Sequence, residues 1–160
     1  MSSNPMQRVV SEIIVVDLDG TLTNASYRAK QYLQKGHEDW DAFYMSCGAD
    51  VPIKPVIDIV SDLGVHYDIV LCSGRRESCR ETTMAWLEQF APDLNYCALL
   101  LRKDGDNRHD VEVKPELLDN YIKTCNHHTV VRAVFEDRDS MVAKWRELGY
   151  TCFQPAPGDF

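Results

Sequence analysis

The fold of this 160-residue chain is decided by Glu12-Ile13-Ile14-Val15-Val16-Asp17-Leu18-Asp19-Gly20-Thr21. The apolar, mostly β-branched run from Ile13 to Val16 is typical of a strand buried on both faces of a parallel sheet. Asp17 follows at the carboxyl end of this strand, the edge where open α/β sheets bind ligands. Two carboxylates spaced by one residue at that edge can bind a hard cation, or share the roles of nucleophile and proton-transfer group. A strand that runs into an ordinary Asp-Gly turn is the alternative for so short a motif.

The composition is that of an ordinary globular protein, with 44% hydrophobic and 26% charged residues. No apolar run approaches the roughly 20 residues of a membrane span, so we expect no membrane partner. The beginning of the chain shows no signal peptide, and the six cysteines have no regular spacing, which together favour a cytoplasmic location. The net charge of −8 argues against unspecific binding to nucleic acid. It still allows a metal ion and a few arginines to bind a phosphate locally.

Strand and helix patterns alternate along the chain, which predicts an α/β fold with a parallel sheet flanked by helices. We expect strands at 13–16, 66–72, 96–101, 129–135 and 151–154, and helices at 56–63, 77–90, 114–124 and 140–148. The stretch 23–51 is polar and aromatic, with one expected helix around 39–47. About thirty residues inserted directly after the first strand predict a small cap above the ligand edge. We therefore expect residues 1–160 to form one domain with a cap insertion at about 23–51.

Polar side chains stand at the ends of four predicted strands. They are Asp17 and Asp19, then Ser73-Gly74-Arg75, then Arg102, and finally Glu136-Asp137, while Lys114 opens the helix between the last two. Each group alone has an ordinary structural explanation, such as a turn, a helix cap or a solvated surface residue. Because the carboxyl ends of parallel strands meet at one edge of a sheet, their order along the chain predicts a common site.

These positions match, in order, the four motifs of the haloacid dehalogenase-like (HAD) phosphatases, and the chain resembles that superfamily. A closer resemblance, to the 3′-phosphatase domain of bacteriophage polynucleotide kinase-phosphatases, extends from Ile13 to the end of the chain. It is carried by Asp17-x-Asp-Gly-Thr with Arg28 eleven residues on, Ser73-Gly-Arg75, the run from Arg102 to Lys114, and the ending Cys152-Phe-Gln-Pro-Ala-Pro-Gly-Asp-Phe. The resemblance implies a HAD-like Rossmannoid sheet.

The resemblance also implies a role for each site residue. Asp17 is ionised at neutral pH and can attack a phosphomonoester without a separate base, forming an aspartyl-phosphate. Asp19 would serve as general acid and base, and Ser73 and Lys114 would bind the non-bridging oxygens. Mg²⁺ is the implied cofactor, with ligands from Asp17, the Asp19 backbone carbonyl, Asp137 and, less directly, Glu136. Further substrate-binding residues would be Thr21, Arg28, Gly74, Arg75, Arg102 and Asp110, the last also positioning Lys114.

Three functions remain open at this stage. The first is a Mg²⁺-dependent phosphomonoesterase that removes 3′-phosphate from nucleic-acid ends or 3′-nucleotides. The second is a phosphatase of free nucleotides or other small phosphomonoesters, which the acidic charge makes credible. The third, from another class, is a phospho-accepting binding module without turnover, although Asp19 supplies an acid/base group that such a module lacks. A Gly-x-x-x-x-Gly-Lys-Ser/Thr phosphate loop does not occur in these 160 residues, so we expect no 5′-kinase activity from them.

Aromatic residues are concentrated in the predicted cap. Trp40, Phe43 and Tyr44 recur at helical spacing, which favours the inner face of the cap over a surface that stacks on bases. Both interpretations are compatible with the sequence.

Overall fold

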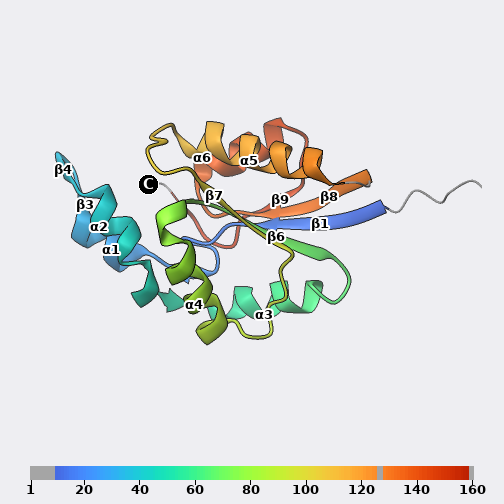
Figure 1. Ribbon diagram of the computed structural model, residues 1–160, viewed down its shortest axis with the longest axis horizontal. Helices are drawn as coiled ribbons and strands as arrows, with labels where there is room; N and C mark the ends of the chain where they lie inside the picture. Colours follow the sequence, from blue (N-terminus) through green and yellow to red (C-terminus); the bar gives the residue numbers. More distant parts are fainter. Residues whose placement is uncertain (1–9, 126–127, 159–160) are drawn as a thin grey trace, which may run out of the picture.

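The computed structural model describes residues 10–125 and 128–158, and its centre is a parallel five-stranded sheet in the order β7-β6-β1-β8-β9 (Figure 1). All neighbouring strands pair in parallel. Their bounds are β1 Val10–Val16, β6 Asp68–Arg76, β7 Ala98–Arg102, β8 His128–Phe135 and β9 Cys152–Phe153. The predicted α/β fold is confirmed, and the strand that carries the deciding motif is the central one.

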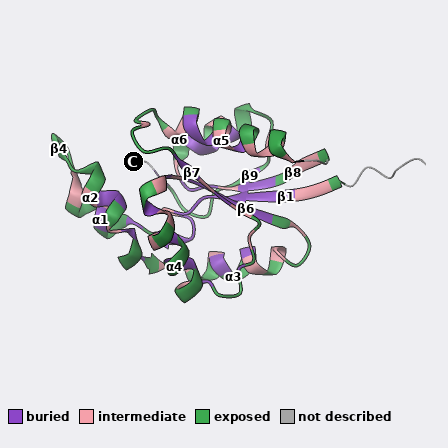
Figure 2. Cartoon of the chain, viewed as in Figure 1, coloured by how far each residue is buried: buried purple, intermediate pink, exposed green. Residues whose placement is uncertain are grey.

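Helices cover both faces of this sheet (Figure 1). On one face lie α3 (Lys54–Leu63) and α4 (Arg80–Phe90), and on the other α5 (Asp110–Thr124) and α6 (Asp139–Glu147). Ile14 and Val16 pack on the side of α3 and α4, and Ile13 and Val15 pack on the side of α5 and α6. The run Ile13 to Val16 is thus buried on both faces, as its composition predicts, and the buried residues in Figure 2 follow the sheet.

Helix α5 begins four residues earlier than the sequence pattern suggests. A proline favours the first turn of a helix, so Pro115 indicates a start near Lys114. In the structure Pro115 lies inside the helix, and Asp110 and Glu112 occupy the first turn. Carboxylates near a helix N-terminus interact favourably with its dipole, which stabilises the earlier start. Lys114 consequently lies one turn inside α5 and is buried.

The segment between β1 and α3 forms a small layer of its own at the carboxyl edge of the sheet (Figure 1). Its ends pair as β2 (Thr23–Asn24) and β5 (Val51–Pro52). Between them lie α1 (Ser26–Tyr32), the hairpin β3 (Leu33–Gln34) and β4 (His37–Glu38), α2 (Trp40–Met45) and a short 3₁₀ turn, Cys47–Ala49. Helix α2 was predicted, whereas α1 was not. Helix α1 spans seven residues and its one buried side chain is that of Arg28, so it lacks the apolar stripe that reveals a helix.

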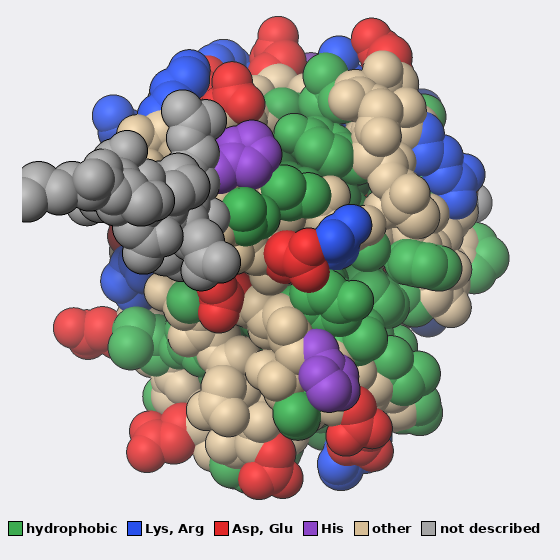
Figure 3. Space-filling view, turned by 90° about the vertical axis from the view of Figure 1, so that its right-hand side faces the viewer, with side chains coloured by type: hydrophobic (Ala, Val, Ile, Leu, Met, Phe, Trp, Pro, Cys, Tyr) green, Lys and Arg blue, Asp and Glu red, His purple; other side chains and the backbone are tan. Residues whose placement is uncertain are grey.

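The end of the molecule opposite this layer presents acidic and basic side chains interspersed with apolar ones (Figure 3). Within the described residues, no helix combines the length and apolar character needed to cross a membrane.

Candidate active site

A cavity of about 690 Å³ lies between the carboxyl edge of the sheet and the cap layer. Nine of the predicted site residues line it: Asp17, Asp19, Ser73, Gly74, Arg102, Asp110, Lys114, Glu136 and Asp137. The strand ends therefore meet at one site. The remaining three, Thr21, Arg28 and Arg75, are buried and do not line the cavity.

Three buried carboxylates form the acidic part of the site. Oxygens of Asp17, Glu136 and Asp137 all lie within 4.8 Å of one another. Lys114 reaches into this group from α5, with Nζ 2.8 Å from Asp17 Oδ1 and 2.7 Å from Glu136 Oε2. One ammonium group thus pairs with two of the three carboxylates.

Three carboxylates facing one ammonium group leave this charge balance incomplete. Burial is the main cause that raises the pKa of Asp17 to about 7, and the charge of Glu136 is the second. The pKa of Asp137 is also raised to about 7, mainly by burial and secondly by the charge of Asp17. Burial would lower the pKa of Lys114, but Asp17 and Glu136 outweigh it and raise that pKa well above its usual value, so Lys114 stays protonated. Carboxylate oxygens in excess of the local positive charge are a donor set that fits a hard divalent cation such as Mg²⁺.

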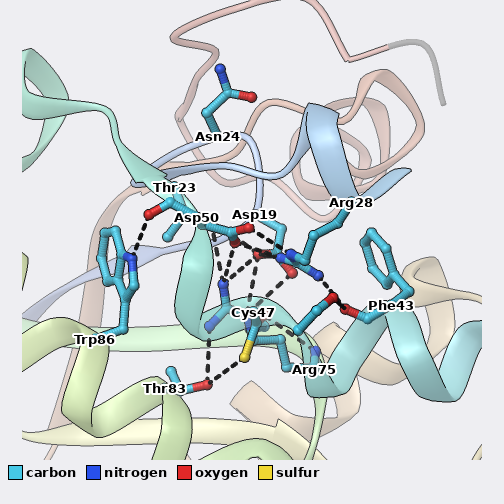
Figure 4. Close-up of polar contacts among 12 residues, drawn as sticks. Asp19, Thr23, Asn24, Arg28, Phe43, Cys47, Asp50, Arg75, Thr83 and Trp86 are labelled. Atoms are coloured by element: carbon cyan, nitrogen blue, oxygen red, sulfur yellow. Dashed lines mark hydrogen bonds and ion pairs between the residues drawn. The ribbon is translucent and has the colours of Figure 1, made fainter. Parts of the chain in front are cut away.

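Asp19 has a different environment, although it lies only two residues from Asp17. Arg75 donates to it from Nη2 at 2.6 Å and from Nε at 3.1 Å, and Arg28 donates from Nη2 at 2.8 Å (Figure 4). The Thr23 hydroxyl adds a bond of 3.1 Å. Burial opposes ionisation, but the charges of Arg75 and Arg28 hold the pKa of Asp19 far below its usual value. The carboxylate of Asp19 is therefore ionised and fixed in place.

A second acid, Asp50, completes this arginine network and was missed by the sequence analysis. It accepts from Arg28 Nε at 2.6 Å and from Arg75 Nη2 at 3.1 Å, and its backbone carbonyl accepts from Trp86 Nε1 at 2.8 Å (Figure 4). Two buried guanidinium groups thus bridge two carboxylates, one from the loop after β1 and one from the end of the cap. Asp50 precedes Val-Pro at the end of a polar stretch, so nothing in its local sequence distinguishes it from a loop residue.

Arg28 and Arg75 therefore face Asp19 and Asp50 rather than the cavity. Arg28 also donates to the backbone carbonyl of Phe43 at 2.7 Å, and Arg75 to the Thr83 hydroxyl at 3.0 Å (Figure 4). A direct contact between either arginine and a substrate stays a prediction. What the structure shows is that they orient Asp19.

Asp110 organises the opposite wall of the cavity. Its carboxylate is paired with Arg102 and accepts from Arg138 Nη1 at 2.9 Å, while its charge helps to raise the pKa of Lys114. Gly74 permits this arrangement, because a Cβ there would lie 2.6 Å from Asp110 Oδ1. Arg138 was not predicted; its position directly after Glu136-Asp137 is the available signal.

Gly20 is required for similar reasons at the end of β1. Its φ of +94° is a conformation that side chains rarely adopt, and a Cβ would lie 2.0 Å from Asp137 Oδ2. The neighbouring Thr21 donates from Oγ1 to Asp137 Oδ1 at 3.4 Å. The Asp-Gly-Thr turn therefore positions Asp137 as well as its own Asp19.

The fold and the site define the chain as a HAD-type phosphatase domain. Residues 11–160 match the family model described as polynucleotide kinase PNKP phosphatase domain, and the chain belongs to that family. It is 31% identical over 140 residues to the "Putative bifunctional polynucleotide kinase/RNA ligase" of Autographa californica nuclear polyhedrosis virus, covering 84% of this chain and 18% of the viral protein.

Solved structures give the same classification. The chain is similar to a chain in the structure of a Pnkp1/Rnl/Hen1 complex, with 27% identity and a TM-score of 0.75 over 99% of this chain and 50% of that one. It shares its fold with the class C acid phosphatase from Bacillus anthracis, at 17% identity and a TM-score of 0.62, over 97% of this chain and 69% of that one. The chain thus spans about half of the first structure's chain and less than a fifth of the viral relative.

Gly20→Ala tests the steric role of the turn. We expect it to lower phosphatase activity by about 100-fold, because a small displacement of a reacting group is enough for such a loss. Gly149→Ala is the matched control: its φ is +88°, but nothing lies within 4 Å of the added Cβ. Gly149→Ala should lose about 1–3 kcal/mol in the free energy of unfolding, since it places a side chain in a strained backbone region. Gly20→Ala should lose more, because the clash with Asp137 adds to the same backbone strain. Thermal unfolding and hydrolysis of a phosphomonoester measure the two effects, and equal activity in the two variants would contradict the proposed contact with Asp137.

Proposed function

We propose that this domain is a Mg²⁺-dependent phosphomonoesterase that removes 3′-phosphate from nucleic-acid ends through an aspartyl-phosphate on Asp17. The observation that carries the proposal is the 2.8 Å contact of the Lys114 ammonium with Asp17 inside a cluster of carboxylates. A nucleophilic carboxylate, a permanent cation for phosphate oxygens and a set of oxygen donors for a metal ion are thereby combined in one cavity.

In the first half of the proposed reaction, Asp17 Oδ forms a bond to phosphorus as the bond from phosphorus to the 3′-oxygen breaks. The Ser73 hydroxyl and the Lys114 ammonium bind the non-bridging oxygens, where charge is spread in the transition state. The leaving oxygen takes a proton from Asp19, which therefore has to be protonated at this step. The negative charge of an entering phosphate raises the pKa of Asp19 and so counteracts the lowering of that pKa by the two guanidinium groups.

In the second half, water attacks phosphorus of the aspartyl-phosphate and the bond to Asp17 Oδ breaks, releasing inorganic phosphate. Asp19, now ionised, accepts the proton of the attacking water. The hydrogen bonds from Arg75 and Arg28 hold the Asp19 carboxylate in position to accept this proton.

Mg²⁺ would be held by the carboxylates of Asp17, Asp137 and Glu136 together with the Asp19 backbone carbonyl. When bound, it would reduce the repulsion between an anionic nucleophile and an anionic phosphate. Lys114 already neutralises part of the charge of the three carboxylates. A bound cation would also lower the pKa of Asp17, which burial and Glu136 raise to about 7, and so favour the ionised nucleophile.

Two observations support nucleic-acid ends as the substrate class. The relatives are named for polynucleotide kinase and RNA ligase activities and for an RNA repair complex. The cavity is also lined by cationic side chains beyond the reacting centre. They include Lys30, where a neighbouring phosphate can bind, and Arg76 and Arg108, which are paired with Asp41 and with Asp106 and Glu116. Phosphatase action on free nucleotides is the second candidate, favoured by the net charge of −8. The free cysteines suit a reducing compartment, and we propose that the domain acts in the cytoplasm.

The substrate class can be measured by phosphate release from 3′-phosphorylated oligonucleotides, 5′-phosphorylated oligonucleotides and mononucleotides. We expect the highest kcat/KM with the first. A higher kcat/KM with mononucleotides would favour the second candidate.

Asp17→Asn should reduce turnover by more than about 10⁴-fold, because general acid–base help alone contributes only about 10²–10⁴. The change is nearly isosteric, so the fold should persist. Asp58→Asn, at an exposed position of α3, serves as the control and should retain full activity. Activity of Asp17→Asn within about tenfold of wild type would exclude the covalent mechanism.

Excess chelator should abolish hydrolysis, and Mg²⁺ added above the chelator should restore it. Because a ligand that binds the folded state stabilises it, Mg²⁺ should also raise the Tm of the wild-type domain. Asp137→Asn, which lacks one proposed ligand, should need more Mg²⁺ for either effect. Full hydrolysis in excess chelator would contradict the metal site.

Arg28→Lys should lower kcat/KM equally for a 3′-phosphorylated oligonucleotide and for a small phosphomonoester, because Arg28 acts through Asp19. Lysine keeps the charge that two buried carboxylates require but loses the planar fork. Lys30→Ala is the matched control on the same helix: Lys30 is exposed and lines the cavity. In Lys30→Ala, kcat/KM should fall mainly for the oligonucleotide, and this decrease should become smaller as the salt concentration rises. A loss in Arg28→Lys restricted to the oligonucleotide would instead indicate direct contact with the nucleic acid.

A further inference from the structure

The cap contributes an aromatic wall to the same cavity that binds phosphate. Trp40, Phe43 and Tyr44 of α2 line it, together with small and apolar residues of the preceding elements, Ala25, Ala29 and Leu33. Phosphate recognition at the carboxyl edge requires charge and hydrogen bonds and has no use for such a surface. The aromatic wall therefore indicates a second, apolar part of the ligand.

The three rings are packed so that one of them stays available. Phe43 and Tyr44 are buried with their centroids 5.3 Å apart, and Arg28 lies over the Phe43 ring with Cζ 4.3 Å from its centroid. Trp40 packs on both, with centroid distances of 5.8 and 6.0 Å, yet its own side chain is 43% exposed. The indole is thus supported from behind and open toward the cavity.

Polar groups surround this aromatic surface. Arg76 from the end of β6 lies over the Tyr44 ring, 5.2 Å from its centroid, and donates to Asn107 at 3.2 Å. Its Nε–H is buried and has no hydrogen-bond partner among the described residues. Asn107, Arg108 and His109 lie in the exposed loop between β7 and α5 and line the same cavity. An aromatic surface with donors around it is complementary to a planar heteroaromatic ring.

We infer that Trp40 is a stacking platform for the nucleobase of the nucleotide that bears the reacting phosphate. The inference rests on the proposed function and names the part of the nucleic-acid end that the cap recognises. Stacking tolerates every base, because each has a π-face, so the platform distinguishes a nucleotide from a simple phosphomonoester without reading sequence. Phe43 and Tyr44 support the indole, and the Arg28 contact with Phe43 connects the platform to the network that orients Asp19.

The first experiment measures binding without turnover. Of the three tryptophans, Trp86 and Trp145 are buried, so Trp40 is the indole available to a ligand. In the inactive Asp17→Asn background, a 3′-phosphorylated oligonucleotide should quench tryptophan fluorescence, and the same oligonucleotide with an abasic 3′-terminal residue should quench it much less. Adding Trp40→Phe should remove most of the quenching while retaining binding, measured by anisotropy of an end-labelled oligonucleotide.

The second experiment measures kcat/KM. Trp40→Ala should lower it by about 5- to 150-fold for the base-bearing 3′-phosphorylated end, the range expected from loss of one base–aromatic stack. For the abasic end and for glycerol 2-phosphate, Trp40→Ala should change kcat/KM by less than about twofold. Trp40→Phe should recover most of the kcat/KM that Trp40→Ala loses on the base-bearing end. Tyr27→Ala is the matched control, since Tyr27 is a cap aromatic that is 77% exposed but does not line the cavity.

The outcomes separate this inference from the proposed function. Equal losses of Trp40→Ala on base-bearing and abasic ends would reduce Trp40 to a structural residue of the cap and overturn the inference. Hydrolysis of 3′-phosphorylated ends without fluorescence quenching would also overturn it, while leaving the proposed function intact. Base-dependent quenching in a domain that fails to hydrolyse such ends would support the platform and contradict the proposed reaction.

Discussion

The site depends on one contact, the Lys114 ammonium between the carboxylates of Asp17 and Glu136. Like charges in a buried site repel strongly, and removing carboxylates from water is costly in itself. A parallel sheet nevertheless brings β1 and β8 side by side, so the acids that end these strands must meet. Lys114 is the cation that makes this meeting tolerable. The remaining excess of negative charge is what makes the cluster a candidate for a divalent ion.

Two carboxylates separated by one residue acquire opposite character in this fold. The pKa of Asp17 rises to about 7 because it is buried among other acids, whereas Arg75 and Arg28 hold the pKa of Asp19 far below its usual value. Groups whose pKa values are driven apart by their surroundings are suited to different chemical roles. The cap is part of this division, because both Arg28 and Asp50 belong to the segment that follows β1.

The cap therefore has two connected functions in the proposed enzyme. Its inner residues complete the arginine network around Asp19, and its aromatic residues form one wall of the cavity. Arg28 belongs to both, since its guanidinium bridges Asp19 and Asp50 and also covers the Phe43 ring. A cap that were displaced from the core would lose both the aromatic wall and one of the two guanidinium groups that hold Asp19. The position of the cap and the orientation of Asp19 are in this way linked.

The sequence alone determined the parallel α/β fold and the central strand. An apolar run that ends in Asp-x-Asp-Gly indicates, from its local pattern, both a buried strand and the turn that follows it. It also indicated which polar residues meet, since strand ends in a parallel sheet share one edge. The tertiary structure alone decided the surroundings of Arg28, Asp50 and Trp40. Arg28 lies on a short helix without an apolar stripe, and Asp50 forms its ion pairs with residues 22 and 25 positions away. Trp40 shares its helical spacing with two buried rings, and only the packing of the cap shows that its own ring stays open to the cavity.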